Sequence, residues 1–243
     1  MVKQAKSRTS RQAEPARAPW QPLRWLRRWA LRVLLVPVAL IVVLVLLFSV
    51  VNPRVTYTMW VEYGKYGRMD RQWMPLEQIA PVMARSVVAA EDANFCLHWG
   101  FDVTAIRAAI EDGGNRGGST ISQQVVKNVF LWQGRSWFRK ALETSITPLV
   151  EAVWSKRRIL EVYLNVAELG EGVFGVEAAA RRAFGVAAKD LSPRQAALIA
   201  AVLPSPRSRS AAKPSDRVQR RATAIMDGAA TIRADGRAAC FED

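Results

Sequence analysis

The uneven spread of apolar residues divides the chain into a polar start, one long apolar run and a long amphipathic remainder. Residues 1–23 are polar and basic, contain prolines and show no apolar period, which is typical of a disordered tail. Residues 33–51 contain no charged residue. Because a bilayer crossing needs roughly 20 apolar residues, this run predicts one transmembrane helix over residues 33–51. A cleaved signal peptide is the alternative, but its apolar core usually spans only about 7 to 15 residues and ends at a small-residue cleavage site.

Beyond the apolar run, the pattern predicts a short extended piece followed by helices. Residues 55–62 alternate β-branched and aromatic side chains before a glycine-containing turn, which predicts an extended stalk or small hairpin over residues 52–74. From Leu76 to Glu91 apolar residues recur at helical steps. Further helices are predicted at residues 103–111, 119–131, 136–168, 173–184, 192–203 and 215–231. We therefore expect a mainly helical domain over residues 75–243, with a mobile glycine-rich loop at residues 111–118.

The basic residues are concentrated before the apolar run and set its expected orientation. Nine Lys and Arg against one acid precede it, which leaves +6 of the formal +14 for the remainder. Since basic flanks stay in the cytoplasm, residues 1–32 are predicted to be cytoplasmic and the C-terminal domain to be exported. The basic exported part favours anionic membrane lipids or a phosphorylated substrate as partners. Nucleic acid is not expected, because no recognition motif accompanies the charge.

The two cysteines leave two readings open. Cys96 and Cys240 are the only cysteines in the chain. An exported location permits a disulfide between them, and two reduced thiols are equally consistent with the sequence.

The first candidate motif is the acid pair Glu91-Asp92, which closes a predicted helix seven residues before the only histidine, His98. On spacing alone, a carboxylate at a helix end is usually solvated or caps the helix. The sequence has no Cys/His cluster and no Gly-x-Ser-x-Gly motif, so a hydrogen-bonding, structural His98 is favoured over a metal ligand or a triad member.

The second motif, residues 117–128, begins with two glycines and continues into a predicted helix. Ser119 or Thr120 can cap this helix, and Thr120, Gln123 and Lys127 lie along one of its faces. Amides and an ammonium group suit sugar hydroxyls and phosphate. The Gly-Lys-Ser/Thr ending of a nucleotide P-loop is missing, and an ordinary polar helix face is the alternative interpretation.

The third motif, residues 135–143, combines cations with a second carboxylate, Glu143. Arg139 and Glu143 are one helical step apart, so a surface salt bridge is one interpretation. The other is a diphosphate-binding cluster beside a second active-site acid, because Arg and Lys both bind phosphate well.

Together these motifs resemble the peptidoglycan glycosyltransferases of glycosyltransferase family 51, in particular the monofunctional biosynthetic transglycosylases. The resemblance covers about residues 75–210. Its patterns are Glu-Asp-x-x-Phe-x-x-His-x-Gly at 91–100, Gly-Gly-Ser-Thr-Ile-x-Gln-Gln at 117–124 and Arg-Lys-x-x-Glu at 139–143, followed by matches at 156–165, 172–180 and 191–206. Within the fourth match, Glu161 and Asn165 are interpreted as structural.

The resemblance implies a lysozyme-like, two-lobed, mainly α fold that polymerises lipid II into β-1,4-linked glycan with inversion and release of undecaprenyl diphosphate. By analogy Glu91 is the general base, which takes the proton of the acceptor's 4-hydroxyl, and Glu143 is a second catalytic acid whose role stays open. The implied substrate-binding residues are Ser119, Thr120, Gln123, Gln124, Lys127, Asn128, Arg135, Arg139 and Lys140.

The same resemblance sets the expected surroundings of the enzyme. It implies a bacterial inner-membrane protein with a periplasmic catalytic domain, and it names lipid II, the growing glycan strand, transpeptidases and divisome or elongation proteins as candidate partners. A divalent cation, Mg or Mn, is an option for assisting the diphosphate, and no organic cofactor is expected. Ser210 and Lys213 have Ser-x-x-Lys spacing, but no Lys-Thr-Gly follows, so no transpeptidase domain is expected. A lysozyme-like hydrolase and a non-enzymatic scaffold are the alternatives.

Overall fold

The computed structural model describes residues 22–113, 118–134 and 136–242. The predicted tail up to residue 21, the centre of the predicted mobile loop and Arg135 therefore lie outside the described residues. The chain divides into two compact units, Met1–Leu40 and Ile41–Asp243.

The apolar run predicted to cross a membrane forms a helix, with shifted bounds. Helix α1 spans Pro22–Phe48 and includes Pro37. Within its segment Arg24–Phe48, an 18-residue window has a mean hydropathy of 3.0, and 6% of that window is buried. By length and composition, it is the one helix among the described residues that could cross a membrane.

The extended stalk or hairpin predicted after this helix is wrong, because the middle of that stretch forms helix α2, Tyr57–Tyr66. Thr56 caps α2 by accepting a hydrogen bond from the Met59 N–H at 3.3 Å. Thr58, Met59 and Glu62 are buried at helical spacing, and Gly67 ends the helix with φ of +64°. Packing of this face against the rest of the protein overrides the strand preference of the aromatic residues.

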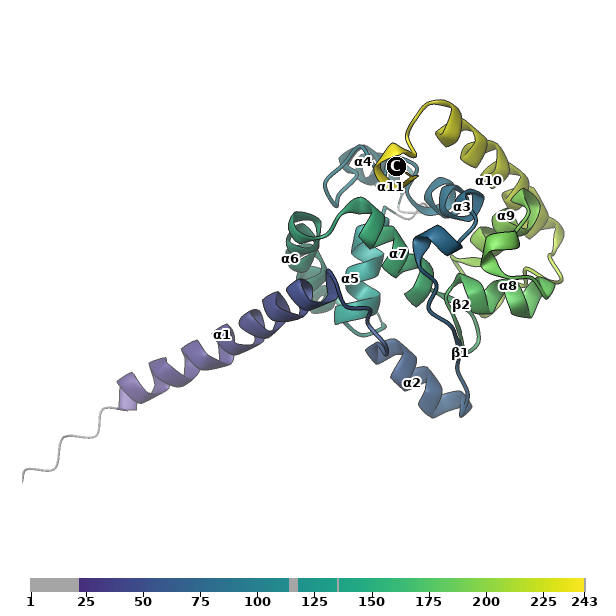
Figure 1. Cartoon of the computed structure of the whole chain (residues 1–243). Coiled ribbons are helices and arrows are strands. Elements are labelled where there is room, and N and C mark those ends of the chain that lie inside the picture. Colours follow the sequence, from purple (N-terminus) through teal and green to yellow (C-terminus); the bar gives the residue numbers. More distant parts are fainter. Residues whose placement is uncertain (1–21, 114–117, 135, 243) are drawn as a thin grey trace, which may run out of the picture. The chain divides into compact units, whose positions relative to one another are not determined.

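The main unit contains two groups of packed helices (Figure 1). In one group, α3 (Pro81–Glu91), α9 (Pro193–Val202) and α10 (Asp216–Ala234) pack against one another. In the other, α5 (Ile121–Phe130) packs against both α6 (Trp137–Val153) and α7 (Lys156–Val166). The helix predicted at residues 192–203 is confirmed, and the apolar side chains of α9 are buried from Ala196 to Val202. The smaller helices are α4 (Val103–Glu111), α8 (Val176–Phe184), α11 (Ala239–Glu242), η1 (Leu76–Gln78) and η2 (Ala188–Asp190).

The single helix predicted over residues 136–168 is wrong, because the chain breaks between α6 and α7. Trp154 is extended, with φ of −101° and ψ of 139°, and its indole N–H donates to the Val45 carbonyl at 2.8 Å. Ser155 then caps α7 by accepting from the Arg158 N–H at 3.1 Å. The buried hydrogen bond of Trp154 depends on a residue more than 100 positions away, so the helical period did not reveal the break.

A small sheet replaces the start of the helix predicted at residues 173–184. Strands β1 (Asp70–Arg71), β3 (Val173–Phe174) and β2 (Glu168–Gly170) lie in that order, with β1 parallel and β2 antiparallel to β3. Asn165 binds the backbone of Met74 through both its Oδ1, at 2.7 Å, and its Nδ2, at 2.8 Å. This contact confirms the structural reading of Asn165.

The cysteine question is settled in favour of a disulfide. Cys96, in the loop after α3, is bonded to Cys240 in α11. The bond ties the C-terminal segment to the loop that follows Glu91.

Candidate active site

Glu91 is the last residue of α3, and its carboxylate is largely buried. Pro81 opens this helix, while Met83, Val87 and Val88 anchor its apolar face in the core. One Glu91 oxygen, Oε2, accepts a hydrogen bond from Gln124 Nε2 of α5 at 2.9 Å. The other, Oε1, lies 3.7 Å from Arg221 Nη2 of α10. The carboxylate is therefore held between two helices that come from distant parts of the sequence.

The surroundings of Glu91 favour the neutral acid more than water does. Burial raises the pKa of the Glu91 carboxyl above its ordinary value. The hydrogen bond from Gln124 and the charges of Arg221 and Lys127 lower this pKa, and the charge of Asp92 raises it. A carboxylate with a raised pKa is a stronger base than an exposed one, which suits the acceptance of a proton from a hydroxyl.

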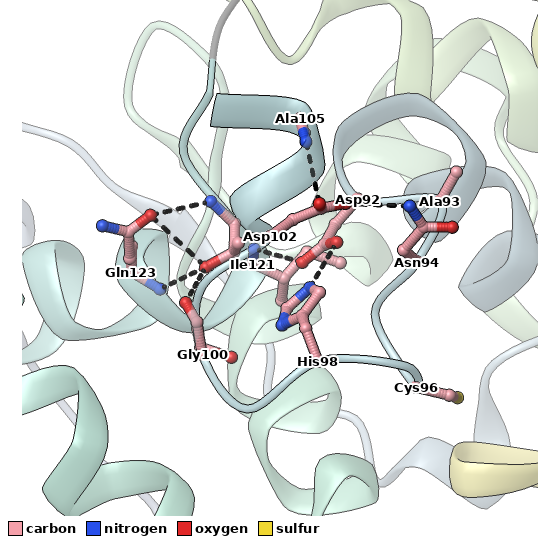
Figure 2. A network of polar contacts seen from close by, with 12 residues as sticks. Asp92, Ala93, Asn94, Cys96, His98, Gly100, Asp102, Ala105, Ile121 and Gln123 are labelled. Atoms are coloured by element: carbon pink, nitrogen blue, oxygen red, sulfur yellow. Dashed lines mark hydrogen bonds and ion pairs between the residues drawn. The ribbon is translucent and has the colours of Figure 1, made fainter. Parts of the chain in front are cut away.

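The next residue, Asp92, links the end of α3 to the start of α5 through its carboxylate (Figure 2). Its Oδ1 lies 2.8 Å from His98 Nε2, and its Oδ2 accepts the N–H of Ile121 at 3.0 Å. Ile121 is the first residue of α5, so the Asp92 carboxylate also complements the positive end of that helix. These contacts confirm a hydrogen-bonding, structural role for His98.

The structure shows why the first motif ends with a glycine, Gly100. Its φ is +85°, and a Cβ at this position would lie 2.8 Å from Thr147 Cγ2 and 3.1 Å from Glu151 Cγ. Its carbonyl accepts a hydrogen bond from Thr120 Oγ1 at 2.7 Å. Only glycine allows the loop to pass this close to α6 while contacting the start of α5.

The second motif starts α5 with a capping box. The Thr120 hydroxyl accepts from the Gln123 N–H at 3.3 Å, and Gln123 Oε1 accepts from the Thr120 N–H at 3.1 Å. Both side chains are buried. The structure thus gives Thr120 and Gln123 a capping function, and their predicted substrate contacts stay predictions.

The same helix presents Gln124 and Lys127 towards the acids. Gln124 contacts Glu91 directly. Burial lowers the pKa of Lys127, the charges of Glu143 and Glu91 raise it, and those of Arg139 and Lys140 lower it. Lys127 therefore lies within the electric field of both predicted catalytic acids. Asn128 instead accepts a hydrogen bond from Gln133 Nε2 at 3.1 Å, and Gln133 also contacts Thr58 of α2 at 3.0 Å.

The third motif forms a cation cluster on the first turns of α6. The buried Glu143 accepts from Arg139 Nη1 at 2.8 Å and from Lys140 Nζ. Lys140 also lies 3.5 Å from the hydroxyl of the exposed Ser119. A cavity of about 420 Å³ opens beside this cluster and is lined in part by Phe101, Ile106, Ile110, Gln123 and Lys140. Arg135 belongs to the predicted cluster but lies outside the described residues.

The described side chains do not form a metal site of their own. Among residues 22–113, 118–134 and 136–242, no three His, Cys, Asp or Glu side chains are grouped so that they could hold a metal ion. Both oxygens of Glu143 are already paired with cations. The divalent cation predicted to assist the diphosphate stays a prediction.

Two residues near Glu91 were not predicted as part of the site. Arg221 lies 130 positions from Glu91 in an arginine-rich helix that looks like an ordinary charged surface. Tyr163 is buried with the apolar side chains of its helix, but its hydroxyl contacts Gln124 Oε1 at 3.2 Å. No spacing in the sequence indicates either contact, because both depend on how α7 and α10 pack.

Comparisons with known proteins assign this chain to a family. Residues 60–230 match the family model described as Transglycosylase, so the chain belongs to the transglycosylase family and has its lysozyme-like, mainly helical fold.

Several relatives are named biosynthetic peptidoglycan transglycosylase. The one from Jannaschia sp. (strain CCS1) is 63% identical, with 89% of this chain and 90% of the relative covered. The Caulobacter vibrioides relative is 46% identical over 89% and 96% of the two chains. The relative from Pseudomonas putida (strain GB-1) is 54% identical over 74% and 81%.

Proposed function

We propose that this protein is a peptidoglycan transglycosylase of cell-wall synthesis that polymerises lipid II into β-1,4-linked glycan strands. Membership of the transglycosylase family and the names of its relatives support the broader activity. One observation carries the finer proposal. The largely buried carboxylate of Glu91 interacts electrostatically with Lys127, and Lys127 also interacts with the cation cluster of Arg139 and Lys140.

In the proposed reaction, Glu91 acts as a general base on the acceptor. The 4-hydroxyl oxygen of lipid II attacks the anomeric carbon of the growing strand, and its proton passes to Glu91 as the new bond forms. The bond between that carbon and the diphosphate breaks, and its electron pair leaves with undecaprenyl diphosphate. Attack from the opposite side inverts the anomeric centre. The raised pKa of Glu91 favours this transfer.

The leaving diphosphate needs positive charge more than it needs a proton. Lys127, Arg139 and Lys140 supply this charge in the proposal, and Arg135 joins them on the evidence of the sequence. The planar guanidinium of Arg139 suits two phosphate oxygens at once, whereas the lysines act as compact charges. A divalent cation would have to take most of its ligands from the diphosphate itself.

Glu143 serves in this proposal as the residue that orients the cations. It contacts Arg139 at 2.8 Å and also Lys140, and its side chain is only 4% exposed. An acid that already accepts from two cations is poorly placed to receive a proton from the substrate. Of the roles left open by the sequence, the pairing geometry favours this one.

The apolar helix supports a membrane location for the enzyme. We propose a single pass through the bacterial inner membrane, with the basic N-terminus in the cytoplasm and the catalytic unit in the periplasm. The Cys96–Cys240 disulfide is in keeping with an oxidising compartment. Transpeptidation is not part of the proposal, because the Ser210 hydroxyl accepts from the Lys213 N–H at 3.1 Å and so closes a turn.

The decisive experiment supplies lipid II in detergent and compares polymer formation by the wild type and Glu91→Gln. We expect the substitution to reduce turnover by about 10²- to 10⁴-fold, the usual contribution of a general base. The exposed Glu171→Gln, which makes the same chemical change, should keep wild-type turnover. Polymer formation by Glu91→Gln at the wild-type rate would remove Glu91 from the mechanism, and release of soluble disaccharides would favour a hydrolase.

A further inference from the structure

A chain of two hydrogen bonds leads from the core to Glu91. Tyr163 of α7 is 1% exposed, and its phenol donates to Gln124 Oε1 at 3.2 Å. The other end of the same amide, Gln124 Nε2, donates to Glu91 Oε2 at 2.9 Å. We call these three side chains the relay. They come from α7, α5 and α3, and α5 packs closely against α7.

The direction of the relay follows from the hydrogen-bonding capacity of each group. An ionised carboxylate can only accept, so the amide of Gln124 must turn its NH₂ group towards Glu91. Its carbonyl then faces Tyr163, which has one O–H to donate. If the amide turned around, its carbonyl oxygen would face a carboxylate oxygen without a proton between them.

The phenol of Tyr163 is suited to keep its proton. Burial raises the pKa of Tyr163 well above its ordinary value, and the charges of Glu91 and Asp92 raise it further. Tyr163 therefore remains a donor throughout the pH range in which a carboxylate base can work. The donor end of the relay does not change with pH, so only Glu91 titrates.

We propose that Tyr163 is a positioning residue that acts through Gln124 to hold Oε2 of Glu91 and to leave Oε1 for the acceptor's hydroxyl proton. This inference rests on the proposed role of Glu91 as the base. It also gives Gln124 a task other than the direct substrate contact predicted from the sequence. A substrate contact would mainly affect KM, whereas a positioning role affects kcat.

The relay also bears on the pH at which the enzyme works. Charged or titratable groups from several elements interact with Glu91. These groups are Lys127 on α5, Tyr163 on α7, Arg221 on α10, Arg209 after α9 and the neighbouring Asp92. Among the contacts that the described residues make to its side chain, the one from Gln124 in the relay is the only hydrogen bond. Donation from Gln124 stabilises the ionised form, so loss of its alignment raises the pKa of Glu91. Because the base must be ionised, activity should then begin to fall at a higher pH.

The test is Tyr163→Phe, which removes the hydroxyl and keeps the ring. In polymerisation assays with lipid II, we expect kcat to fall about five- to ten-fold and KM to stay within two-fold. The acid limb of the profile of kcat against pH should move to higher pH. The matched control is Ser86→Ala, which removes a buried hydroxyl from the same helix as Glu91, and this hydroxyl has no hydrogen-bond partner among the described residues. Its kcat and acid limb should equal those of the wild type.

A second variant covers the case in which Tyr163→Phe does not fold, as judged by its thermal transition. Gln124→Met preserves side-chain length but removes the donation to Glu91, and it should move the acid limb in the same direction. Adding Tyr163→Phe to Gln124→Met should then reduce kcat no further, because the relay is already broken. A further multiplicative fall would overturn the proposal.

The failure of the relay can be told apart from the failure of the proposed function. If Glu91→Gln is inactive but folded Tyr163→Phe keeps both its kcat and its acid limb, the relay is wrong and the base is not. If Glu91→Gln is as active as the wild type, the base and the relay fall together. A raised KM with unchanged kcat in Tyr163→Phe also overturns the positioning role.

Discussion

At the scale of single residues, Glu91 combines two requirements that oppose each other. A buried carboxylate is a better base, but the burial of its charge destabilises the folded protein. The structure limits this penalty with Gln124 on one oxygen and Arg221 near the other. The net result is still a pKa above the ordinary value.

This balance leads to a prediction about stability. Because the pKa of Glu91 is raised in the folded state, its favourable contribution is complete below the unfolded pKa of about 4.3 and is lost as pH rises through the folded pKa. Glu91→Gln imitates the neutral acid. We therefore expect its Tm to exceed that of the wild type at neutral pH, by about 2–4 °C for each kcal/mol gained, and to equal it near about pH 4.

Thermal unfolding of both proteins across this pH range measures the effect. Glu171→Gln removes an exposed charge and should show no such pH-dependent gain. A lower Tm for Glu91→Gln at neutral pH would show that the ionised carboxylate stabilises the fold, contrary to the direction of its pKa shift.

At the same scale, the sequence identified most of the polar side chains that gather at the site, but it did not assign their tasks. The capping box of Thr120 and Gln123 was visible in part, since a Ser or Thr cap follows from local spacing. Pairing of Glu143 with Arg139 was one of two interpretations, again because the residues are one turn apart. Tyr163 and Arg221 were missed because their contacts are long-range. Tyr163 lies 39 positions from Gln124 in the sequence, and Arg221 lies 130 positions from Glu91.

At the scale of elements, the C-terminal helix α11 supports the loop that follows α3. Phe241 is buried and lies 6.5 Å, ring to ring, from Phe95 in that loop. Arg157 donates to the Phe241 carbonyl at 2.8 Å, and Cys240 is bonded to Cys96. A short helix of four residues has little stability of its own, so these contacts hold it in place.

We therefore expect the disulfide to stabilise this region strongly. It joins residues 144 positions apart, and closing a loop of that length in the unfolded chain is worth about 4–5 kcal/mol in the chain-entropy model. Reduction with dithiothreitol should lower the Tm by several degrees, measured by thermal unfolding with and without the reductant.

The control for this experiment is the double variant with Cys96→Ser and Cys240→Ser. It should unfold at the temperature of the reduced wild type and should not respond to the reductant. An equal Tm for oxidised and reduced wild type would mean that the loop and α11 are held by their other contacts alone.

The elements predicted best are those whose structure is determined by the apolar period of their own residues. The helices over residues 103–111 and 192–203 needed only local spacing and caps. Helix α2 and the break at Trp154 were not predicted, because each depends on burial against distant segments. Aromatic and β-branched residues suit both a strand and a packed helix face, and packing makes the choice.

At the scale of the whole molecule, the end of the apolar helix is part of the catalytic unit. The compact unit begins at Ile41, inside α1. Val45 is fully buried, and the Phe48 ring lies 6.0 Å from that of Phe130. Arg158 donates to the carbonyls of Phe48, at 3.0 Å, and Val51, at 2.9 Å.

The point of truncation should therefore matter. A protein of residues 41–243 should unfold at the same temperature as the full chain. It should also polymerise short-chain lipid II at the same rate as the full chain. A protein of residues 52–243 loses Val45 and Phe48 from the core, and we expect it to be less stable by about 3 kcal/mol or more. Thermal unfolding in the same detergent compares the three proteins.

The same pair of truncations separates stability from membrane attachment. If residues 1–40 hold the enzyme at the bilayer, their removal should lower the rate on long-chain lipid II in vesicles and leave the rate on a short-chain substrate unchanged. If the proteins with and without residues 1–40 have equal rates on both substrates, this part of the chain is only a tether. Equal stability of residues 41–243 and 52–243 would contradict the place of Val45 in the core.

The sequence by itself determined the mainly helical class, the apolar run, the ordered motifs and the presence of acids beside Lys and Arg residues. These properties depend on composition, period and short spacings, all of which are encoded within a few turns of chain. Only the tertiary structure decided that α2 is a helix, that Arg221 and Tyr163 reach the site and that Glu91 is buried enough for its pKa to rise. Burial and long-range contacts depend on which faces pack together, and no local pattern specifies that.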